Sequence, residues 1–487
     1  MLTRDSSAST SNVSAAVTLT RQSFMYALIA IIPGMMMVML DSTAMNVAIP
    51  SLTHDFHATF ETLQWVINGY MLAMAATVPL SGWFSDKIGA GRAYLTTVML
   101  FIFGSLLCSL AQNAGQLIAF RIIQGLGGGM IQPIGMAMIY RLAPQDKKGQ
   151  SMGLLGIPML IAPATGPILS GWLLESIGWQ WIFLINLPIG AFAVWLGLRH
   201  LCKHGHLQKT EKKHQPFDRL GAMLAPTAFV LLTLSINQHS SSNGESLVMG
   251  VTGVLLLIWL CIHELRHENP ILELRAFRAY HFRRGMIVSS IQYAALNGSL
   301  VFIPLFLQKY RSYSPFDAGL IMSMLAITSG LLMPVGGKIY DRFGIRPLAC
   351  AGLGTIAVAL LLLSWISDTT YHLQIAGIVG LLGIGMGLCM MSLNTYILQS
   401  APASMISRIT PLTAAGANLI IPVAIACLSN FLAMRTFSYA VNVYKDNPVA
   451  AEMAAYSDTF LVAACIALGG ACFSLLLKPR QGPKKEY

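Results

Sequence analysis

One carboxylate in this sequence stands where carboxylates are expensive. Asp41 lies within an apolar run that begins near Phe24 and is long enough to cross a bilayer. Burial away from water disfavours the charged form of a carboxyl group, and ionisable side chains inside membrane spans are usually functional. A carboxyl group that gains and loses a proton there can couple proton flow to another movement. The alternative is a carboxyl group that only hydrogen-bonds a neighbouring helix.

Arg121 is the only basic residue deep within a predicted apolar run. Its insertion costs roughly 2.5–3.5 kcal/mol, so it needs a partner. Counting from the ends of both runs puts Asp41 and Arg121 at similar depth, and Gln124 lies one helical turn from Arg121 on the same face. We predict that Arg121 senses the protonation of Asp41 through a network that includes Gln124. The alternative is a structural arginine held by backbone carbonyls.

A short loop pattern, Gly-x-x-x-Asp-(Lys/Arg)-x-Gly, occurs twice, beginning at residues 82 and 337. Its glycines permit close helix approach and positive φ, and its aspartate can cap a helix or pair with an arginine. The duplication predicts two homologous halves with two extra spans between them. The residues assigned to a cytoplasmic loop gate are Gly82, Asp86, Lys87, Gly89, Arg92, Gly337, Asp341, Arg342 and Gly344.

Small residues recur every four positions in the run that begins near residue 149, and three prolines interrupt it. The small residues allow close contact with another helix, whereas the prolines favour a kink. We predict a bent, tightly packed helix that limits leak at the cavity wall. Gly125 and Gly129 form a similar stripe, for which ordinary packing is the alternative. The small residues are Ala162, Gly166 and Ser170, and the prolines are Pro158, Pro163 and Pro167.

The composition indicates how such residues are positioned. Hydrophobic residues make up 55% of the 487 positions and charged residues only 10%, whereas soluble domains carry about 25% charged residues. The mean hydropathy of +0.63 agrees. We predict an all-α integral membrane protein whose first span is retained rather than cleaved. Fourteen runs of roughly 20 apolar residues begin near residues 24, 63, 92, 115, 149, 181, 218, 247, 283, 316, 347, 372, 407 and 455.

The net charge of +11 comes mostly from basic residues in alternate loops. This is the positive-inside pattern rather than a nucleic-acid-binding surface. Both termini fall on the basic side, which is the cytoplasmic side. An even number of spans is consistent with two cytoplasmic termini. Eight scattered cysteines without a C-x-x-C pair indicate buried thiols. The longest basic loop favours a solvated linker over a metal site, although it or its edge contains His200, His204, His206 and His214.

Several motifs together resemble the major facilitator superfamily, specifically its fourteen-span drug:proton antiporters of the EmrB/QacA type, over essentially the whole chain. Residues 40–50, 117–127 and 179–190 are similar to segments in the first, fourth and sixth spans of that family. Residues 156–171 resemble its antiporter motif, and the repeated loop pattern resembles its loop motif. Two departures are Gly91, where relatives often have a basic residue, and Ser170, which replaces one glycine of a usual pair.

The resemblance implies the MFS fold, with two six-helix bundles, two additional spans and cytoplasmic termini. It implies proton coupling by Asp41 and Arg121, with support from Gln124 and Gly125. The implied antiporter motif contains Gly156, Pro163, Gly166, Pro167 and Gly171. The implied parts are a tail (1–23), spans one to six (24–200), a loop (201–217), the additional spans (218–266), spans nine to fourteen (267–477) and a second tail (478–487).

Polar side chains inside spans usually face the protein interior, which gives a set of candidate cavity residues. Asp41 is the only carboxylate in this sequence that we place at mid-membrane depth, so neutral or monovalent lipophilic substrates fit better than multiply charged cations. The candidate residues are Asn46, Gln64, Asn68, Tyr70, Gln292, Asn297, Gln308, Asn394 and Asn418.

The expected function is secondary active transport, namely proton-coupled export of lipophilic drugs or toxic small molecules by alternating access. No P-loop motif is present, so the expected energy source is the proton gradient, without a cofactor or metal. The expected partners are a lipophilic substrate, protons and the lipid bilayer of the bacterial inner membrane. A periplasmic adaptor joins them if the chain comes from a two-membrane bacterium.

Three alternatives compete with this function. A dedicated exporter of one antibiotic, lipid or metabolite would use the same scaffold. A membrane-embedded lipid-modifying enzyme would need an interfacial catalytic cluster, and the loop histidines lack nearby paired carboxylates or a nucleophile. A sensor that does not transport would need a soluble output domain, for which no segment is long enough. We therefore expect a transporter rather than an enzyme.

Overall fold

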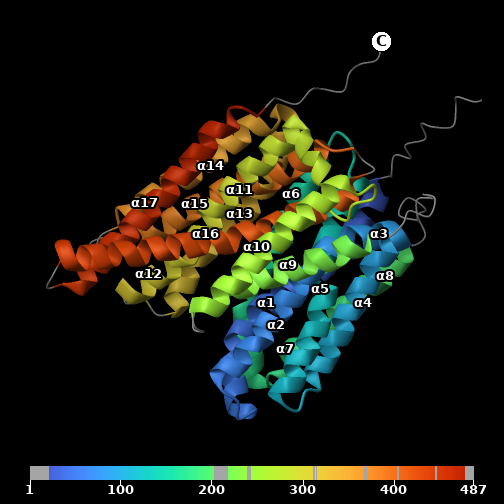
Figure 1. The fold of residues 1–487 in the computed structure, drawn as a ribbon, viewed down its shortest axis with the longest axis horizontal. Helices are drawn as coiled ribbons and strands as arrows, with labels where there is room; N and C mark the ends of the chain where they lie inside the picture. The colour runs from blue at the N-terminus through green and yellow to red at the C-terminus, as the bar shows by residue number, and fades with distance from the viewer. Residues whose placement is uncertain are drawn as a thin grey trace, which may run out of the picture.

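The computed structural model describes residues 21–201, 218–237, 243–310, 313, 315–366, 370–402, 405–444 and 447–477, in which every regular element is a helix (Figure 1). Most of the 201–217 loop and both predicted tails lie outside the described residues. The helices are α1 (Arg21–Asp55), α2 (Phe60–Thr77), η1 (Val78–Leu80), α3 (Ser81–Ile88), α4 (Ala90–Ser109), α5 (Ala114–Leu142), α6 (Lys148–Ser176), α7 (Gln180–Leu184), α8 (Asn186–His200), α9 (Arg219–Asn237), α10 (Asn243–Arg266), η3 (Leu274–Arg278), α11 (Tyr280–Leu300), α12 (Phe302–Tyr310), α13 (Pro315–Phe343), α14 (Ile345–Ser364), α15 (His372–Gln399), α16 (Ile406–Asn442) and α17 (Pro448–Ser474).

Twelve helical segments of the described chain are long and apolar enough to cross a membrane. They coincide with twelve of the fourteen predicted runs, which confirms an all-α, multi-pass membrane protein. The runs predicted near residues 149 and 218 coincide with α6 and α9. The apolar part of α9, Arg219–Ser235, is shorter than the other spans. The count of fourteen and the location of the termini stay predictions.

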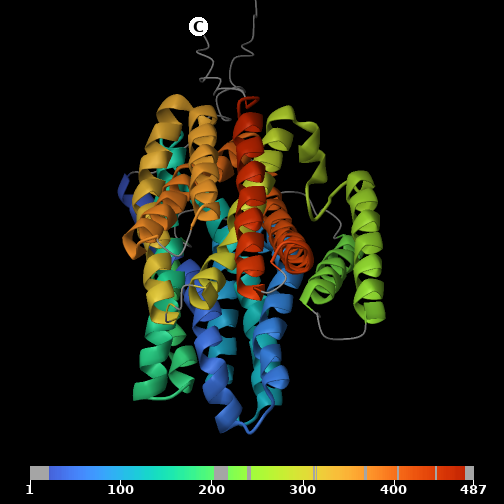
Figure 2. The ribbon, with the colours of Figure 1, turned by 90° about the vertical axis from the view of Figure 1, so that its left-hand side faces the viewer.

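The helices form two halves that meet along α6 and α13. In the first half, α1, α2, α4, α5, α6 and α8 pack together, and in the second α11 packs with α15, α16 and α17, while α14 joins α15 to α17 (Figure 1). The helices α9 and α10 pack against each other to one side of the two halves (Figure 2). Glycines allow the halves to approach, because a Cβ on Gly153 would lie only 2.5 Å from the Met333 carbonyl oxygen.

The small-residue stripe of α6 faces α1, as its four-residue spacing predicts. Ala162 is fully buried, a Cβ on Gly166 would collide with Thr43 Oγ1, and Ser170 Oγ donates to the Ala44 carbonyl at 2.8 Å. The three prolines lie at α6 positions whose side chains fall outside the described residues, so the kink stays a prediction.

The substitution Gly166→Leu is expected to lower the free energy of unfolding by about 1–3 kcal/mol, because the larger side chain overpacks the contact with Thr43. The matched control is Gly171→Leu on the same helix, since nothing lies within 4 Å of a Cβ at that position. Thermal unfolding of the purified protein in detergent measures both. Equal changes in Tm would show that the close approach of α6 to α1 does not limit stability.

The second half contains a paired arginine inside a long helix. The helix α16 continues through Arg435 to Asn442. Its guanidinium Nη2 lies 2.5 Å from Asp458 Oδ2 on α17, and Tyr439 Oη donates to the same carboxylate oxygen at 2.8 Å. A paired arginine inside a long helix gives the same sequence pattern as a polar loop between two apolar runs.

Candidate functional site

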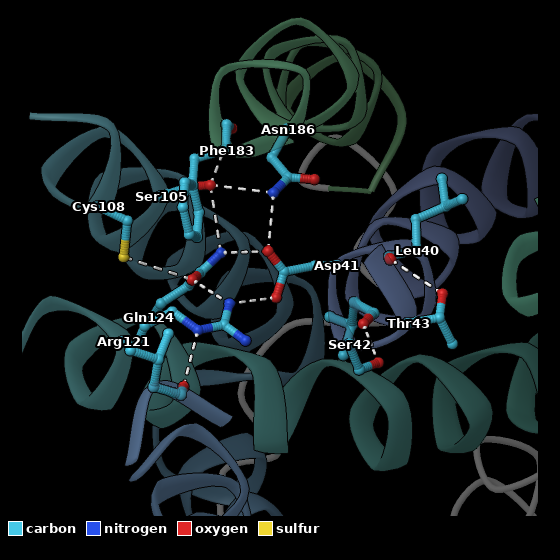
Figure 3. Close-up of polar contacts among 12 residues, drawn as sticks. Leu40, Asp41, Ser42, Thr43, Ser105, Cys108, Arg121, Gln124, Phe183 and Asn186 are labelled. Carbon is cyan, nitrogen blue, oxygen red and sulfur yellow. Dashed lines mark hydrogen bonds and ion pairs between the residues drawn. The ribbon is translucent and has the colours of Figure 1, made fainter. Parts of the chain in front are cut away.

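A buried ion pair joins the two ionisable residues singled out in the sequence. The Asp41 carboxylate on α1 and the Arg121 guanidinium on α5 are 2.5 Å apart, from Oδ2 to Nη1 (Figure 3). Their side chains are 0% and 1% exposed, respectively. Removing one partner from such a pair leaves an uncompensated buried charge, so each residue makes the other tolerable.

Two side-chain amides complete the contacts of the Asp41 carboxylate. Gln124 Nε2 donates to Asp41 Oδ1 at 3.0 Å, and Asn186 Nδ2 of α8 donates to the same oxygen at 3.1 Å (Figure 3). Gln124 Oε1 also accepts from Arg121 Nη1 at 2.8 Å. Three donors therefore point at the two carboxylate oxygens and use three of their roughly four lone-pair sites, which leaves one site on Oδ2 for a proton.

Ser105 of α4 links the two amides to each other. Its hydroxyl oxygen accepts from Gln124 Nε2 at 3.2 Å and from Asn186 Nδ2 at 3.0 Å. The hydroxyl donates in turn to the Phe183 carbonyl at 2.9 Å. The hydroxyl hydrogen and both lone pairs of Ser105 are thus used. The network therefore joins four helices of the first half, α1, α4, α5 and α8.

The opposite side of Arg121 is covered by α2. The Arg121 Nε donates to the Val66 carbonyl at 3.2 Å, and the guanidinium carbon lies 3.9 Å from the centroid of the Tyr70 ring. A cation over an aromatic face is attracted by the ring quadrupole, and more strongly where water is excluded. Tyr70, a candidate for the substrate cavity, thus lies against Arg121 inside the first half.

A narrow pocket reaches Asp41 between α1, α6 and the α7–α8 segment. Its lining is mostly apolar, and its polar members are Asp41, Ser170 and Asn186. Gly166 of the predicted antiporter motif also lines it. The stripe of small residues on α6 therefore forms one wall of a space that borders the carboxylate.

The first copy of the loop pattern binds the start of α16 in the other half. Asp86 accepts from Ser407 Oγ at 2.6 Å and from Arg408 Nε at 3.2 Å. A Cβ on Gly82 would collide with the Ser407 carbonyl oxygen. Gly89 has φ +90°, a conformation that residues with a Cβ rarely adopt.

The second copy binds the start of α6, again across the two halves. Asp341 accepts from the backbone N–H groups of Gly149 at 2.8 Å and Gln150 at 2.9 Å, two groups that have no partner within the helix itself. A Cβ on Gly337 would collide with the Gly149 carbonyl oxygen, and Gly344 has φ +79°. The basic residues of the two copies, Lys87, Arg92 and Arg342, are exposed.

The other predicted site residues are spread over the molecule. A Cβ on Gly125 would lie 2.6 Å from the Tyr70 carbonyl oxygen, and one on Gly156 would collide with Met333 Sδ. The side chains of Asn46, Pro163 and Pro167 fall outside the described residues. The remaining cavity candidates differ in burial, so that role stays a prediction. Gln64, Gln308 and Asn418 are exposed, Asn68 and Asn297 half-buried, and Gln292 and Asn394 buried.

Ser105 and Asn186 belong to the Asp41 network but were not predicted as site residues. Ser407 and Arg408, which bind Asp86, were not predicted either. The only sequence signal was the position of Asn186 in the motif that enters the sixth run. Serine and asparagine are inexpensive in a membrane helix compared with charged residues, so their presence alone says little.

The sequence profile of the Major Facilitator Superfamily matches residues 31–425. The chain belongs to this superfamily. Within it, the chain is 31% identical over 375 residues to the multidrug resistance protein B homolog of Mycobacterium tuberculosis, covering 76% of this chain and 68% of the relative. It is 28% identical over 444 residues to the riboflavin transporter RibZ of Clostridioides difficile, covering 91% and 95%.

A solved structure shows the same superfamily fold. The proton:xylose symporter XylE bound to 6-bromo-6-deoxy-D-glucose aligns with a TM-score of 0.60 at 14% sequence identity, covering 94% of this chain and 96% of that chain. The protein is therefore a multi-pass membrane transporter of the superfamily, with relatives named for multidrug resistance.

Proposed function

We propose that this transporter exports lipophilic drugs or toxic small molecules in exchange for protons, by alternating access across a bacterial inner membrane. The observation that carries the proposal is the fully buried Asp41–Arg121 pair within a membrane bundle. Its location inside a transporter supports a role in coupling, because intramembrane ionisable groups usually mark ion pathways.

The proposed coupling uses the hydrogen bonds of the cluster. Charged Asp41 holds donors from α5 and α8 against α1. A proton on Asp41 removes that charge, weakens the bonds from these donors and so changes how the helices pack. Each proton entering the cell yields about 2.3 kcal/mol per 100 mV, and a pH difference of one unit adds about 1.4 kcal/mol.

The proposed gate consists of the two loop aspartates. Asp86 and Asp341 each bind the first turn of a helix from the opposite half, so the halves are held together at that end. We assign this end to the cytoplasm because the basic loops lie there. Opening toward the cytoplasm then requires both contacts to break.

The proposed topology has fourteen spans with cytoplasmic termini. The length of α6, 29 residues, and its contacts with α1 and α13 support a span there. The helix α9 packs against the span α10, and adding it to the twelve candidate spans and α6 brings the number of spans to fourteen. An even number of spans agrees with the basic residues near both ends of the chain.

A second candidate is a dedicated exporter of one natural substrate. The similarity to a riboflavin transporter over 91% of the chain favours this candidate. It shares the scaffold and the coupling cluster with multidrug export and differs only in the breadth of substrates. A periplasmic adaptor belongs to either candidate if the source has two membranes.

The experiment that tests the proposal is transport by purified protein in liposomes that enclose a pH indicator. Lipophilic dyes, drugs and riboflavin are offered to wild type, Asp41→Asn and, as a control, Asp146→Asn, whose carboxylate is exposed in a loop. We expect substrate-driven proton release in wild type and Asp146→Asn only. Transport without proton movement in all three would exclude antiport, and transport of riboflavin alone would favour the dedicated exporter.

A further inference from the structure

Three potential metal ligands meet where the α9–α10 pair joins the rest of the chain. Asp218 directly precedes α9, His263 lies in the last turn of α10, and His267 directly follows the end of that helix. Each offers one ligand atom, and these atoms lie within 4.8 Å of one another. The two histidines are four residues apart, so they project from one face of the helix. None of the three belongs to the Asp41 cluster.

The distances within this trio suit a single cation. His263 Nε2 is 2.8 Å from Asp218 Oδ1, and His267 Nδ1 is 3.9 Å from Asp218 Oδ2. Two ligands of a tetrahedral Zn²⁺ at about 2.0–2.2 Å are separated by roughly 3.3–3.6 Å. The two observed distances lie on either side of that range. His267 Nδ1 accepts from the Asn269 N–H at 3.2 Å, so binding an ion through this atom would replace that hydrogen bond. Without an ion, the first contact is a hydrogen bond.

Two buried carboxylate oxygens at this place lack partners. Asp218 is 3% exposed and Glu264 is 0% exposed. Asp218 Oδ2 and Glu264 Oε1 have no hydrogen-bond partner among the described residues. Both oxygens border the same point, because a Cβ on Gly221 would collide with the first and lie 2.8 Å from the second. Buried carboxylates are normally paired or bound to a metal.

The surrounding backbone holds the carboxylates and one histidine in place. Gly221 N–H donates to Asp218 Oδ1 at 2.8 Å, and Leu272 N–H donates to Glu264 Oε2 at 3.3 Å. Arg275 Nη2 donates to the His267 carbonyl at 2.6 Å. The first bond is local to the start of α9, and the other two connect the end of α10 to the segment that leads into α11. Such supporting bonds orient ligands before a metal binds.

We propose that Asp218, His263 and His267 bind one divalent transition-metal ion, with Glu264 beside it as a second carboxylate. Two imidazoles with carboxylate oxygens suit Zn²⁺ and its neighbours, whereas Mg²⁺ and Ca²⁺ prefer all-oxygen ligands. The ion joins the entry of α9 to the exit of α10. This site does not depend on the proposed antiport.

The test uses Co²⁺ as a spectroscopic probe of the full-length protein after chelator treatment. The background variant carries His204→Ala, His206→Ala and His214→Ala, which removes competing ligands from the preceding loop. We expect it to bind one equivalent of Co²⁺ with the visible absorption of a four-coordinate site, and Zn²⁺ to displace the Co²⁺. His54→Gln, an 89% exposed histidine elsewhere, serves as the control and should change neither result.

In the same background, Asp218→Asn and His263→Gln are each expected to weaken Co²⁺ binding by more than about tenfold, the loss that removal of a supporting residue alone can cause. His267→Gln, at a half-exposed position, replaces either variant that elutes as an aggregate in gel filtration. Unchanged binding in the folded variants would overturn the proposal. Loss of all binding in the background variant would also overturn it. The loop histidines would then explain any binding by wild type, and a proton shared by Asp218 and Glu264 would explain how the two carboxylates lie together.

Discussion

Replacing Arg121 by lysine is expected to reduce proton-coupled export strongly while leaving the protein folded. Arginine holds Asp41 and Gln124 through Nη1 and the Val66 carbonyl through Nε, and its flat face covers Tyr70. A lysine ammonium keeps the charge but is a point donor on a flexible stem, without the fork that spans these positions. Loss of one hydrogen bond to a charged group costs about 1.5–3 kcal/mol, so we expect coupled transport to fall by at least about tenfold.

Stability measurements separate this coupling effect from simple unfolding. Arg121→Leu leaves the Asp41 carboxylate buried without a counter-charge, which costs about 3–5 kcal/mol. Adding Asp41→Asn to Arg121→Leu removes that charge and should recover much of the Tm without recovering proton release. Arg283→Lys, at an exposed position without an assigned role, is the matched control. If Arg121→Lys transports with the proton release of wild type, the fork geometry is irrelevant and only the positive charge matters.

The contrast between the members of this cluster shows what a sequence can predict. Asp41 and Arg121 could be paired in advance because each is costly alone in an apolar run and depth counting placed them together. Ser105 and Asn186 carry no such cost, so only the packing of α4 and α8 reveals them. The candidate cavity residues differ in burial for the same reason. The direction of a neutral side chain depends on which helices surround it.

The loop pattern shows a second limit of prediction from the sequence. Its glycines and aspartates predicted close helix contact and helix capping, and both are present. Which helix each aspartate binds depends on how the two halves dock, and that is set by contacts far apart in the sequence. Likewise, the sequence pointed to the histidines of the 201–217 loop as possible metal ligands. His263 and Asp218 are 45 residues apart and meet only because α9 and α10 pack together.

Asp341→Asn is expected to open the end of the molecule that we assign to the cytoplasm. The carboxylate accepts from two backbone N–H groups in the first turn of α6, where the helix dipole also favours a negative charge. Asparagine keeps one acceptor oxygen but places an amide donor against the second N–H. The loss of one charge-assisted bond, about 1.5–3 kcal/mol, shifts the equilibrium between closed and open forms by roughly tenfold or more.

Spin labels on Lys147→Cys and Lys338→Cys, two exposed positions on the α6 and α13 sides of this contact, measure the opening as a distance distribution. A cysteine-free background avoids labelling Cys427, Cys465 and Cys472, which are exposed although the sequence predicted buried thiols. We expect a longer distance to gain population in Asp341→Asn and, because Asp86 binds α16 independently, a further gain in Asp86→Asn/Asp341→Asn. The control Arg346→Gln removes a charge at an exposed position on the same side of the molecule, so it should leave the distribution unchanged. An unchanged distribution in the double variant would mean that packing of α6 on α13, rather than the aspartates, keeps the halves closed.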